Sequence, residues 1–185
     1  LITAVSAVAN GGNLMKPYLV REMVDNEGEV TKSFTPEVVR QVISAETSQQ
    51  LGGILEQVVS AGTGKNAKIA GYKIAGKTGT GQKRDPDTGL YMDGRYVVSF
   101  VAYAPADDPQ IALLVTLDEP MAGAPINRSG GGMAAPTAGR ILADILPYIG
   151  IVPEYGEGEL AQADIAIPAF TGLSVESAKA EAERN

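Results

Sequence analysis

The chain has 185 residues, 44% of them hydrophobic, and a formal net charge of −7. This length allows one domain, or one domain and part of another, and the acidic balance argues against a nucleic-acid partner. Neither Cys nor His occurs. Their absence excludes a thiol nucleophile, a zinc–thiolate site and a Ser-His-Asp triad, and it leaves Lys, Tyr and carboxylates as bases. No run of 18 apolar residues is present, so no membrane-spanning segment is predicted.

The first forty residues predict a helix followed by a hairpin. Apolar residues recur at helical spacing over 1–9, and Asn10-Gly11-Gly12 is a typical helix end. Because this helix has neither a starting Met nor a basic leader before it, we expect the chain to be a fragment of a longer protein. Residues 16–34 predict two strands joined by a turn at 25–28, whereas the sequence leaves the type of 36–43 open.

The middle of the chain predicts a second helix and then a sheet. Residues 44–62 have an amphipathic pattern that begins at a capping Ser or Thr and ends at a glycine. Strands are expected over 72–80, 95–104 and 110–120. The short turn at 105–109 predicts that the last two strands are antiparallel.

Residues 81–95 contain Asp, Gly and Pro but few apolar residues. We therefore expect them to form a long, mobile loop. Asp85, Asp87 and Asp93 lack the spacing of a calcium loop, so they predict a solvated hairpin tip and no metal site.

The C-terminal third predicts a change of domain. Residues 133–151 have the pattern of a helix that packs on the sheet. The acidic stretch 153–164 lacks apolar periodicity and is interpreted as a linker. Residues 165–185 predict a short strand, a turn and a helix that starts near Ser174. The predicted organisation is thus an α+β domain over 1–152, with helices packed on an antiparallel sheet, then the linker, then a small module over 165–185.

The stretch 71–82, GYKIAGKTGTGQ, permits two interpretations. Its first eight letters match the phosphate-binding loop G-x-x-x-x-G-K-[ST], and its centre reads K-T-G. A phosphate loop needs a buried strand before it and a helix that starts at Lys77. The preceding residues are polar, and two glycines and a proline follow Lys77 closely. We therefore reject the phosphate loop and predict an edge strand over 72–80 that pairs with 96–104.

An edge strand leaves N–H and C=O groups free to pair with a peptide. Gly79 removes a side chain where another backbone would approach. Lys77 supplies a cation and Thr80 a hydroxyl, which together suit a peptide that ends in a free carboxylate. An ordinary edge strand with exposed Lys and Thr is the alternative.

Several stretches occur in an order that resembles the C-terminal part of class B penicillin-binding proteins, the D,D-transpeptidases that cross-link peptidoglycan. They are ANGG followed by KPYLV, then IAGKTGTGQ, SFVAYAP, DDPQIALLVTLDEP and GGGMAAPTAGRIL. The resemblance covers residues 1 to about 150 and implies part of the serine β-lactamase/penicillin-binding transpeptidase fold. The tail IPAFTGLSVESAKAEAE resembles the beginning of a PASTA module, which the family often carries after its catalytic domain.

The resemblance implies roles for five residues. Lys77, Thr78 and Gly79 match the K-T-G triad on the strand that lines the active-site groove. Lys77 would place positive charge beside the nucleophile and the substrate carboxylate, and the Thr80 hydroxyl would bind that carboxylate. The Thr80 N–H would be one of two oxyanion donors. Thr78, Gly79 and Gln82 are expected to bind substrate.

The same resemblance implies the partners and the location. The substrate would be the D-Ala-D-Ala end of a peptidoglycan stem peptide, and β-lactams would mimic it. No cofactor is expected. The protein would act at the extracytoplasmic face of the bacterial cell membrane, with its anchor outside this chain.

Two motifs of the family do not occur in the chain. No Ser is followed three places later by Lys, and no Asn has Ser two places before it, so both S-x-x-K and S-x-N are missing. We therefore expect the nucleophile in a missing N-terminal part of the same protein, and the chain alone to be inactive. A serine β-lactamase or a D,D-carboxypeptidase remains an alternative, as does a non-catalytic peptidoglycan-binding module.

Overall fold

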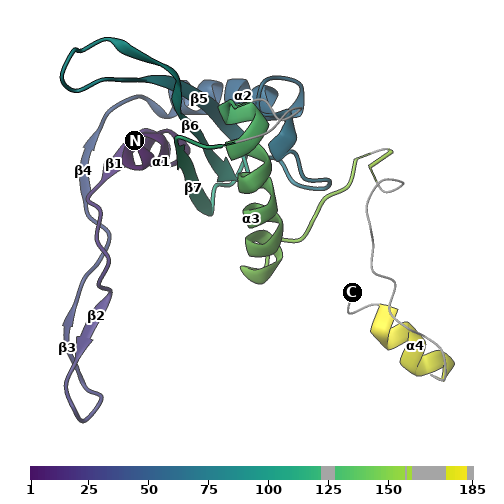
Figure 1. Cartoon of the computed structure of the whole chain (residues 1–185). Coiled ribbons are helices and arrows are strands. Elements are labelled where there is room, and N and C mark those ends of the chain that lie inside the picture. The colour runs from purple at the N-terminus through teal and green to yellow at the C-terminus, as the bar shows by residue number, and fades with distance from the viewer. Residues whose placement is uncertain (122–127, 157, 160–173, 183–185) are drawn as a thin grey trace.

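The computed structural model describes residues 1–121, 128–156, 158–159 and 174–182. Its body is a three-stranded antiparallel sheet with helices packed on it, and a long two-stranded arm projects from this body (Figure 1). This architecture confirms the predicted α+β class. In chain order the elements are α1 (Ile2–Ala9), β1 (Asn13–Met15), β2 (Glu22–Val24), β3 (Val30–Ser33), β4 (Val38–Gln41), α2 (Ala45–Ser60), the 3₁₀-helix η1 (Lys65–Ala67), β5 (Ala75–Arg84), β6 (Tyr91–Ala104), β7 (Ile111–Asp118), the π-helical turn η2 (Gly130–Ala134), α3 (Ala135–Tyr148) and α4 (Val175–Ala182).

The sheet has the order β5-β6-β7, so β5 lies at one edge and β6 in the centre. β5 pairs with β6 in an unbroken antiparallel register from Ala75 to Gln82. This confirms the pairing predicted for 72–80 and 96–104, except that the strand begins at Ala75. β7 pairs antiparallel with β6 along its whole length, as predicted.

The prediction of a long loop over 81–95 is wrong. β5 continues to Arg84 and β6 begins at Tyr91, so only residues 85–90 connect the two strands. The prediction failed because it relied on apolar content. Backbone groups form the ladder of a sheet, so polar residues and glycines can extend a hairpin whose register the apolar pairs have already set.

The tip of this hairpin is held by Asp85. Its carboxylate accepts hydrogen bonds from the N–H groups of Asp87, at 2.8 Å, and Thr88, at 3.0 Å. The bonds from Thr88 and Asp87 hold the pKa of the Asp85 carboxyl below its usual value. The expected solvated hairpin tip is confirmed, with the carboxylate bound to its own turn.

β6 supplies the centre of the core. Phe100, Ala102 and Ala104 are fully buried on one of its faces, and Val101 and Tyr103 are buried on the other. A strand buried on both faces anchors the sheet, because both layers of the domain pack against it. The apolar cluster on the first face also contains Val59 of α2 and Ala138, Leu142 and Leu146 of α3, so α3 packs on the sheet as predicted.

The helix ends follow the predicted capping residues. Ser44 caps α2 by accepting a backbone N–H. α1 ends at Ala9 and is followed by Gly11 and Gly12, which have φ values of 61° and 87°. The Ser48 hydroxyl donates to the carbonyl of Val8. This bond ties the start of α2 to the end of α1.

The arm consists of β1 paired with β4 and β2 paired with β3 (Figure 1). The predicted turn at 25–28 is confirmed, since the Asp25 carboxylate accepts the N–H groups of Glu27 and Glu29 there. The stretch 36–43, whose type the sequence left open, contains β4. All residues of β2, β3 and β4 are exposed, so this arm has no buried side chains of its own along these strands.

After α3, the chain contacts the segment that precedes β5. The Glu154 N–H donates to the carbonyl of Gly71 at 2.7 Å, and Glu159 forms an ion pair with Lys68 at 3.0 Å. The described part of the predicted 153–164 linker is therefore bound to the domain before it.

α4 begins directly after Ser174, whose hydroxyl accepts the Ser177 N–H at 3.2 Å. This confirms the predicted helix start, whereas the strand expected before it lies outside the described residues. The division into 1–152, 153–164 and 165–185 stays a prediction. Among the helices of the described residues, none is both long enough and apolar enough to cross a membrane.

Candidate active site

The KTGT segment, Lys77 to Thr80, lies on β5 at the open edge of the sheet. It pairs with β6 on one side, and within the described residues no strand pairs with the other side. Lys77 and Thr80 are exposed, whereas Thr78 and Gly79 are half-buried. The predicted position of Lys77 and Thr80 at the edge is confirmed. Because Lys77 lies inside β5, no helix begins at this residue, which confirms the rejection of the phosphate loop.

Lys77 carries an exposed ammonium group. Its Nζ donates to the carbonyl of Thr78 at 2.9 Å. In the part of the chain that the structure describes, no carboxylate lies within ion-pair distance of this group. The charge is therefore available to an anionic ligand at the edge of the sheet.

Thr80 is bound to the glycine-rich turn that precedes α3. The N–H of Gly130 donates to the Thr80 hydroxyl oxygen at 3.1 Å. Gly130 also lies against the backbone of Gly79, since a Cβ added to Gly130 would stand 2.5 Å from the Gly79 carbonyl oxygen. A side chain at residue 130 would push the turn away from β5.

Gly79 lies close to other groups of the same chain. A Cβ added to Gly79 would lie 2.5 Å from the Ser99 hydroxyl on β6. The backbone that approaches Gly79 is that of Gly130 in the same chain. The Ser99 hydroxyl would have to rotate away to admit a side chain at residue 79. The expected role of Gly79 in binding substrate stays a prediction.

Two residues that sequence reasoning missed lie beside this strand. The Thr63 and Thr78 hydroxyl oxygens are 3.1 Å apart, and the Asn66 amide donates to the carbonyl of Gly131 at 2.8 Å. Both residues belong to the turn between α2 and β5, inside the sequence GTGKNA. Asn66 is a side-chain amide next to glycine-rich sequence, and this pattern could have marked it as a residue that binds backbone groups. The sequence does not identify its partner, Gly131, which is 65 residues away.

Gln82, which was expected to contact substrate, is engaged within the hairpin. Its side-chain amide donates to the carbonyl of Met92 at 3.0 Å. The amide oxygen remains as an acceptor. The structure therefore places Gln82 on the same strand as the KTGT segment, with one of its two N–H donors occupied.

Together these residues can hold an anion and the end of an extended chain. Lys77 offers a cation, Thr78 and Thr80 offer hydroxyl groups, and the open edge of β5 offers backbone groups to a peptide. None of them is a nucleophile with an adjacent base. The arrangement suits binding and charge stabilisation, and a nucleophile has to come from elsewhere.

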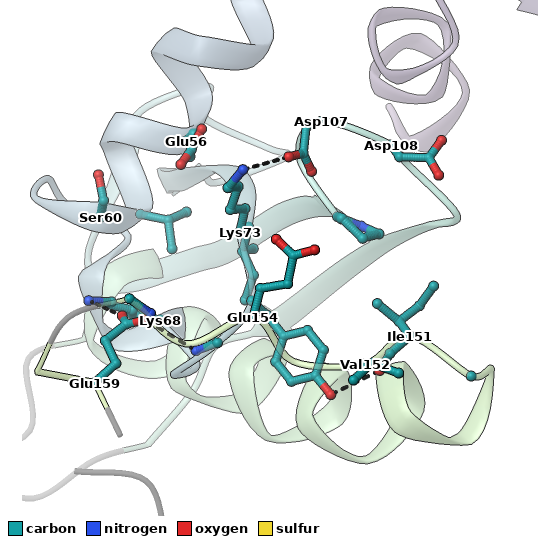
Figure 2. Close-up of a pocket in the computed structure, with 17 residues that line it drawn as sticks. Glu56, Ser60, Lys68, Lys73, Asp107, Asp108, Ile151, Val152, Glu154 and Glu159 are labelled. Atoms are coloured by element: carbon teal, nitrogen blue, oxygen red, sulfur yellow. Dashed lines mark hydrogen bonds and ion pairs between the residues drawn. The ribbon is translucent and has the colours of Figure 1, made fainter. Parts of the chain in front are cut away.

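A hollow of about 650 Å³ lies away from the KTGT segment, between α2, the turn after β6 and the residues that follow α3 (Figure 2). Lys73 donates there to Asp107 at 2.6 Å, and Lys68 pairs with Glu159. The bond to Asp107 raises the pKa of Lys73 and lowers that of Asp107. Both lysines are held as paired cations, so neither is a free base for catalysis. Among the described residues, no group of three or more acidic side chains is arranged to hold a metal ion.

The KTGT segment thus lies on the edge strand of an antiparallel sheet that carries helices. Residues 1–143 match the family model described as the penicillin binding protein transpeptidase domain. The match covers more than half of the chain, so the chain belongs to this family. The resemblance found in the sequence is confirmed, and the match ends before the PASTA-like tail.

Named relatives point in the same direction. The chain is 41% identical over 180 residues to Stage V sporulation protein D of Bacillus subtilis, covering 94% of this chain and 27% of that protein. It is 37% identical over 157 residues to Peptidoglycan D,D-transpeptidase FtsI of Escherichia coli, covering 83% of this chain and 24% of that protein. The chain thus spans about a quarter of the length of these curated relatives.

Solved structures with this fold include one with a bound β-lactam. The structure of penicillin binding protein 3 from Mycobacterium tuberculosis, complexed with ampicillin, matches with a TM-score of 0.72 and 30% sequence identity. The match covers 85% of this chain and 36% of that one. The D,D-transpeptidase domain of a peptidoglycan glycosyltransferase from Eggerthella lenta matches with a TM-score of 0.68 and 30% identity, over 82% of this chain and 32% of that one.

Proposed function

We propose that this chain forms one wall of the active site of a peptidoglycan D,D-transpeptidase, which cross-links stem peptides through a serine acyl-enzyme and binds β-lactams. The observation that carries this proposal is the exposed KTGT segment on the open edge of β5 in a chain of the transpeptidase family. Relatives named as D,D-transpeptidases support it, as does the ampicillin complex of a similar protein.

Acyl transfer requires a nucleophile, a base that activates it and donors for the developing oxyanion. In the proposed enzyme, Lys77 adds positive charge beside the nucleophile and the substrate carboxylate. The Thr80 hydroxyl donates to this carboxylate, and the Thr80 N–H is an oxyanion donor. Thr78 and Gly79 line the groove in which the substrate lies. The exposure of Lys77 and Thr80 at the edge of the sheet supports these roles.

The proposed substrate is a stem peptide that ends in D-Ala-D-Ala. Its extended backbone can pair with the free edge of β5, and its terminal carboxylate can reach the cation and hydroxyls of the KTGT segment. β-Lactams would occupy the same site. Gln82 would take part through its amide oxygen or its second N–H, since one N–H is bound to the Met92 carbonyl.

The proposed nucleophile belongs to sequence outside these 185 residues, because neither S-x-x-K nor S-x-N occurs in the chain. The partner of this chain is then the part of the same protein that carries the serine. Peptidoglycan lies outside the cell membrane, so the domain would act at its extracytoplasmic face, with an anchor elsewhere in the protein. We also retain the PASTA-like module over 165–185 as a proposal, which rests on the resemblance of the tail IPAFTGLSVESAKAEAE alone.

The test is covalent labelling with a fluorescent penicillin, followed by mapping of the adduct. The 185-residue chain alone should remain unlabelled, and the longer protein that joins it to an S-x-x-K serine should form a stoichiometric adduct. An adduct on the isolated chain would contradict the proposal. Rapid release of hydrolysed penicillin would indicate a β-lactamase. Hydrolysis of a D-Ala-D-Ala peptide without transfer to an amine would indicate a carboxypeptidase, and no reaction in either protein would indicate a binding module.

A further inference from the structure

We propose that Asn66 is a positioning residue for the KTGT segment. Its amide holds the glycine-rich turn before α3 in the place where the Gly130 N–H binds the Thr80 hydroxyl oxygen, so that the hydroxyl hydrogen points to the substrate. This inference rests on the proposed transpeptidase function and adds a residue that does not itself touch substrate.

Asn66 is placed by the core next to it. It belongs to η1, whose last residue, Ala67, is fully buried. A Cβ added to Gly139 of α3 would lie 3.1 Å from the Ala67 Cα, so η1 and α3 are in close contact. The Asn66 side chain itself is exposed, and its Nδ2 donates to the Gly131 carbonyl at 2.8 Å. A rigid neighbour therefore holds the donor at a fixed place.

The turn bound by Asn66 is confined from both sides. A Cβ added to Gly131 would lie 2.5 Å from the Thr63 carbonyl oxygen, and one added to Gly130 would lie 2.5 Å from the Gly79 carbonyl oxygen. Gly130 donates its N–H to the Thr80 hydroxyl at 3.1 Å. Gly130 and Gly131 are adjacent residues of the same turn, η2, so a bond that holds the Gly131 carbonyl also restrains the position of Gly130 and of its N–H.

The Gly130 N–H determines the direction in which the Thr80 hydroxyl can donate its hydrogen. A threonine hydroxyl has one hydrogen and two lone pairs. When the Gly130 N–H occupies one lone pair of Thr80, the hydroxyl hydrogen has to point away from Gly130. It is then free to donate to a carboxylate at the exposed edge of β5. If the turn moves, the hydroxyl can rotate, and it loses this preferred direction.

The main test is the kinetics of acylation by a carboxylate-bearing penicillin in the longer protein with the nucleophile. Loss of one neutral hydrogen bond corresponds to a change of about 3- to 10-fold. We expect Asn66→Ala to lower the second-order acylation rate constant by this factor. The loss should appear as weaker binding before acylation, with the limiting acylation rate nearly unchanged. Lys65→Ala, at the exposed neighbouring residue, is the matched control and should leave both constants unchanged.

A double-mutant cycle separates positioning from a merely structural effect. If Asn66 acts through the Thr80 hydroxyl, Asn66→Ala should change acylation less than about 2-fold in a Thr80→Val background. Equal losses in both backgrounds would overturn the proposal. Asn66→Asp keeps the size of the side chain but removes the donor, so its loss should match or exceed that of Asn66→Ala. Wild-type kinetics in either variant would also overturn the proposal.

Hydrogen exchange tests the same contact without any acylation. Peptides that cover 129–134 should exchange faster in Asn66→Ala than in the wild type, and the Lys65→Ala variant should match the wild type. If the wild-type protein is not acylated at all, the proposed function fails, while the hydrogen-exchange measurement still reports on the Asn66 contact. If it is acylated and exchange in 129–134 does not change, the positioning role alone is wrong.

Discussion

The central sheet and the arm are built from similar residues but are stabilised in different ways. Val98 in β6 is fully buried, whereas Val30 in β3 has 54% of its surface exposed. The sheet gains stability from apolar burial on both faces of β6. The arm relies on its backbone ladder and on the Asp25 turn, and isolated two-stranded ribbons are only marginally stable. β-propensity therefore predicts strands in both regions but does not tell which strands form the core.

The largest expected effect is in the sheet. Phe100→Ala should lower the free energy of unfolding by about 3–5 kcal/mol, because Phe100 is fully buried in the main apolar cluster. Urea denaturation of the protein measures it. A loss below about 1 kcal/mol would mean that the sheet is no more dependent on burial than the arm.

The second effect concerns exposed residues, which differ in importance between the two regions. Lys77→Ala, on the sheet edge, should slow acylation by penicillin by ~10²–10³-fold, the factor typical for loss of a charge-stabilising group. Lys32→Ala, on the exposed arm, is the control and should leave the rate unchanged. The measurement is the rate of adduct formation in the longer protein. Equal rates for the two variants would show that Lys77 does not contribute to acylation.

A smaller effect concerns the segment after α3, which is bound by polar contacts. The ion pair with Lys68 holds the pKa of Glu159 below its usual value, together with the Gly156 N–H. A lowered pKa means that this contribution is fully present above the ordinary Glu pKa of about 4.3 and is lost as pH falls through the lower folded pKa.

Hydrogen exchange in 151–156 should therefore increase as pH falls below about 4, after correction for the intrinsic exchange rate at each pH. Lys68→Ala should show the faster exchange already at neutral pH. If the two proteins behave alike over the whole range, the ion pair does not hold this segment.

The smallest effect is expected in the arm. Val30→Thr should change the free energy of unfolding by no more than about 0.5 kcal/mol, since the side chain is exposed and Thr also favours strands. Chemical denaturation next to Phe100→Ala gives the comparison directly. A loss above 2 kcal/mol would show that the arm is covered by something that the described residues do not include.

The sequence predicted the elements that have strong local signals. The cap at Ser44, the turn at 25–28 and the apolar runs of β6 and β7 were all recognised correctly. The KTGT strand was placed at the correct edge because its register follows from the apolar pairs beside it. These features depend on neighbours that are close in the chain or on patterns that repeat along a strand.

The sequence could not predict contacts that join distant turns. Gly130 lies against Gly79, 51 positions earlier in the chain, and Asn66 binds Gly131 across 65 positions. A glycine needed for close approach has the same letter as one needed for a bend, so the pattern does not tell them apart. The hairpin over 81–95 was missed for a related reason, since its outer pairs carry no apolar alternation.

Gly71 connects the segment after α3 to the residues just before β5, the strand that carries the KTGT segment. It has a φ of 77°, and a Cβ there would lie 2.7 Å from the Cβ of Pro153. Its carbonyl binds the Glu154 N–H, and its own N–H donates to Glu159 at 3.4 Å. A pulling force that enters the chain beyond residue 159 would thus be borne first by the Lys68–Glu159 pair and by Gly71. The load would reach α3 only after these contacts opened. Tension from the C-terminal side would therefore act on Gly71, four residues before β5, before it displaced α3 from the sheet.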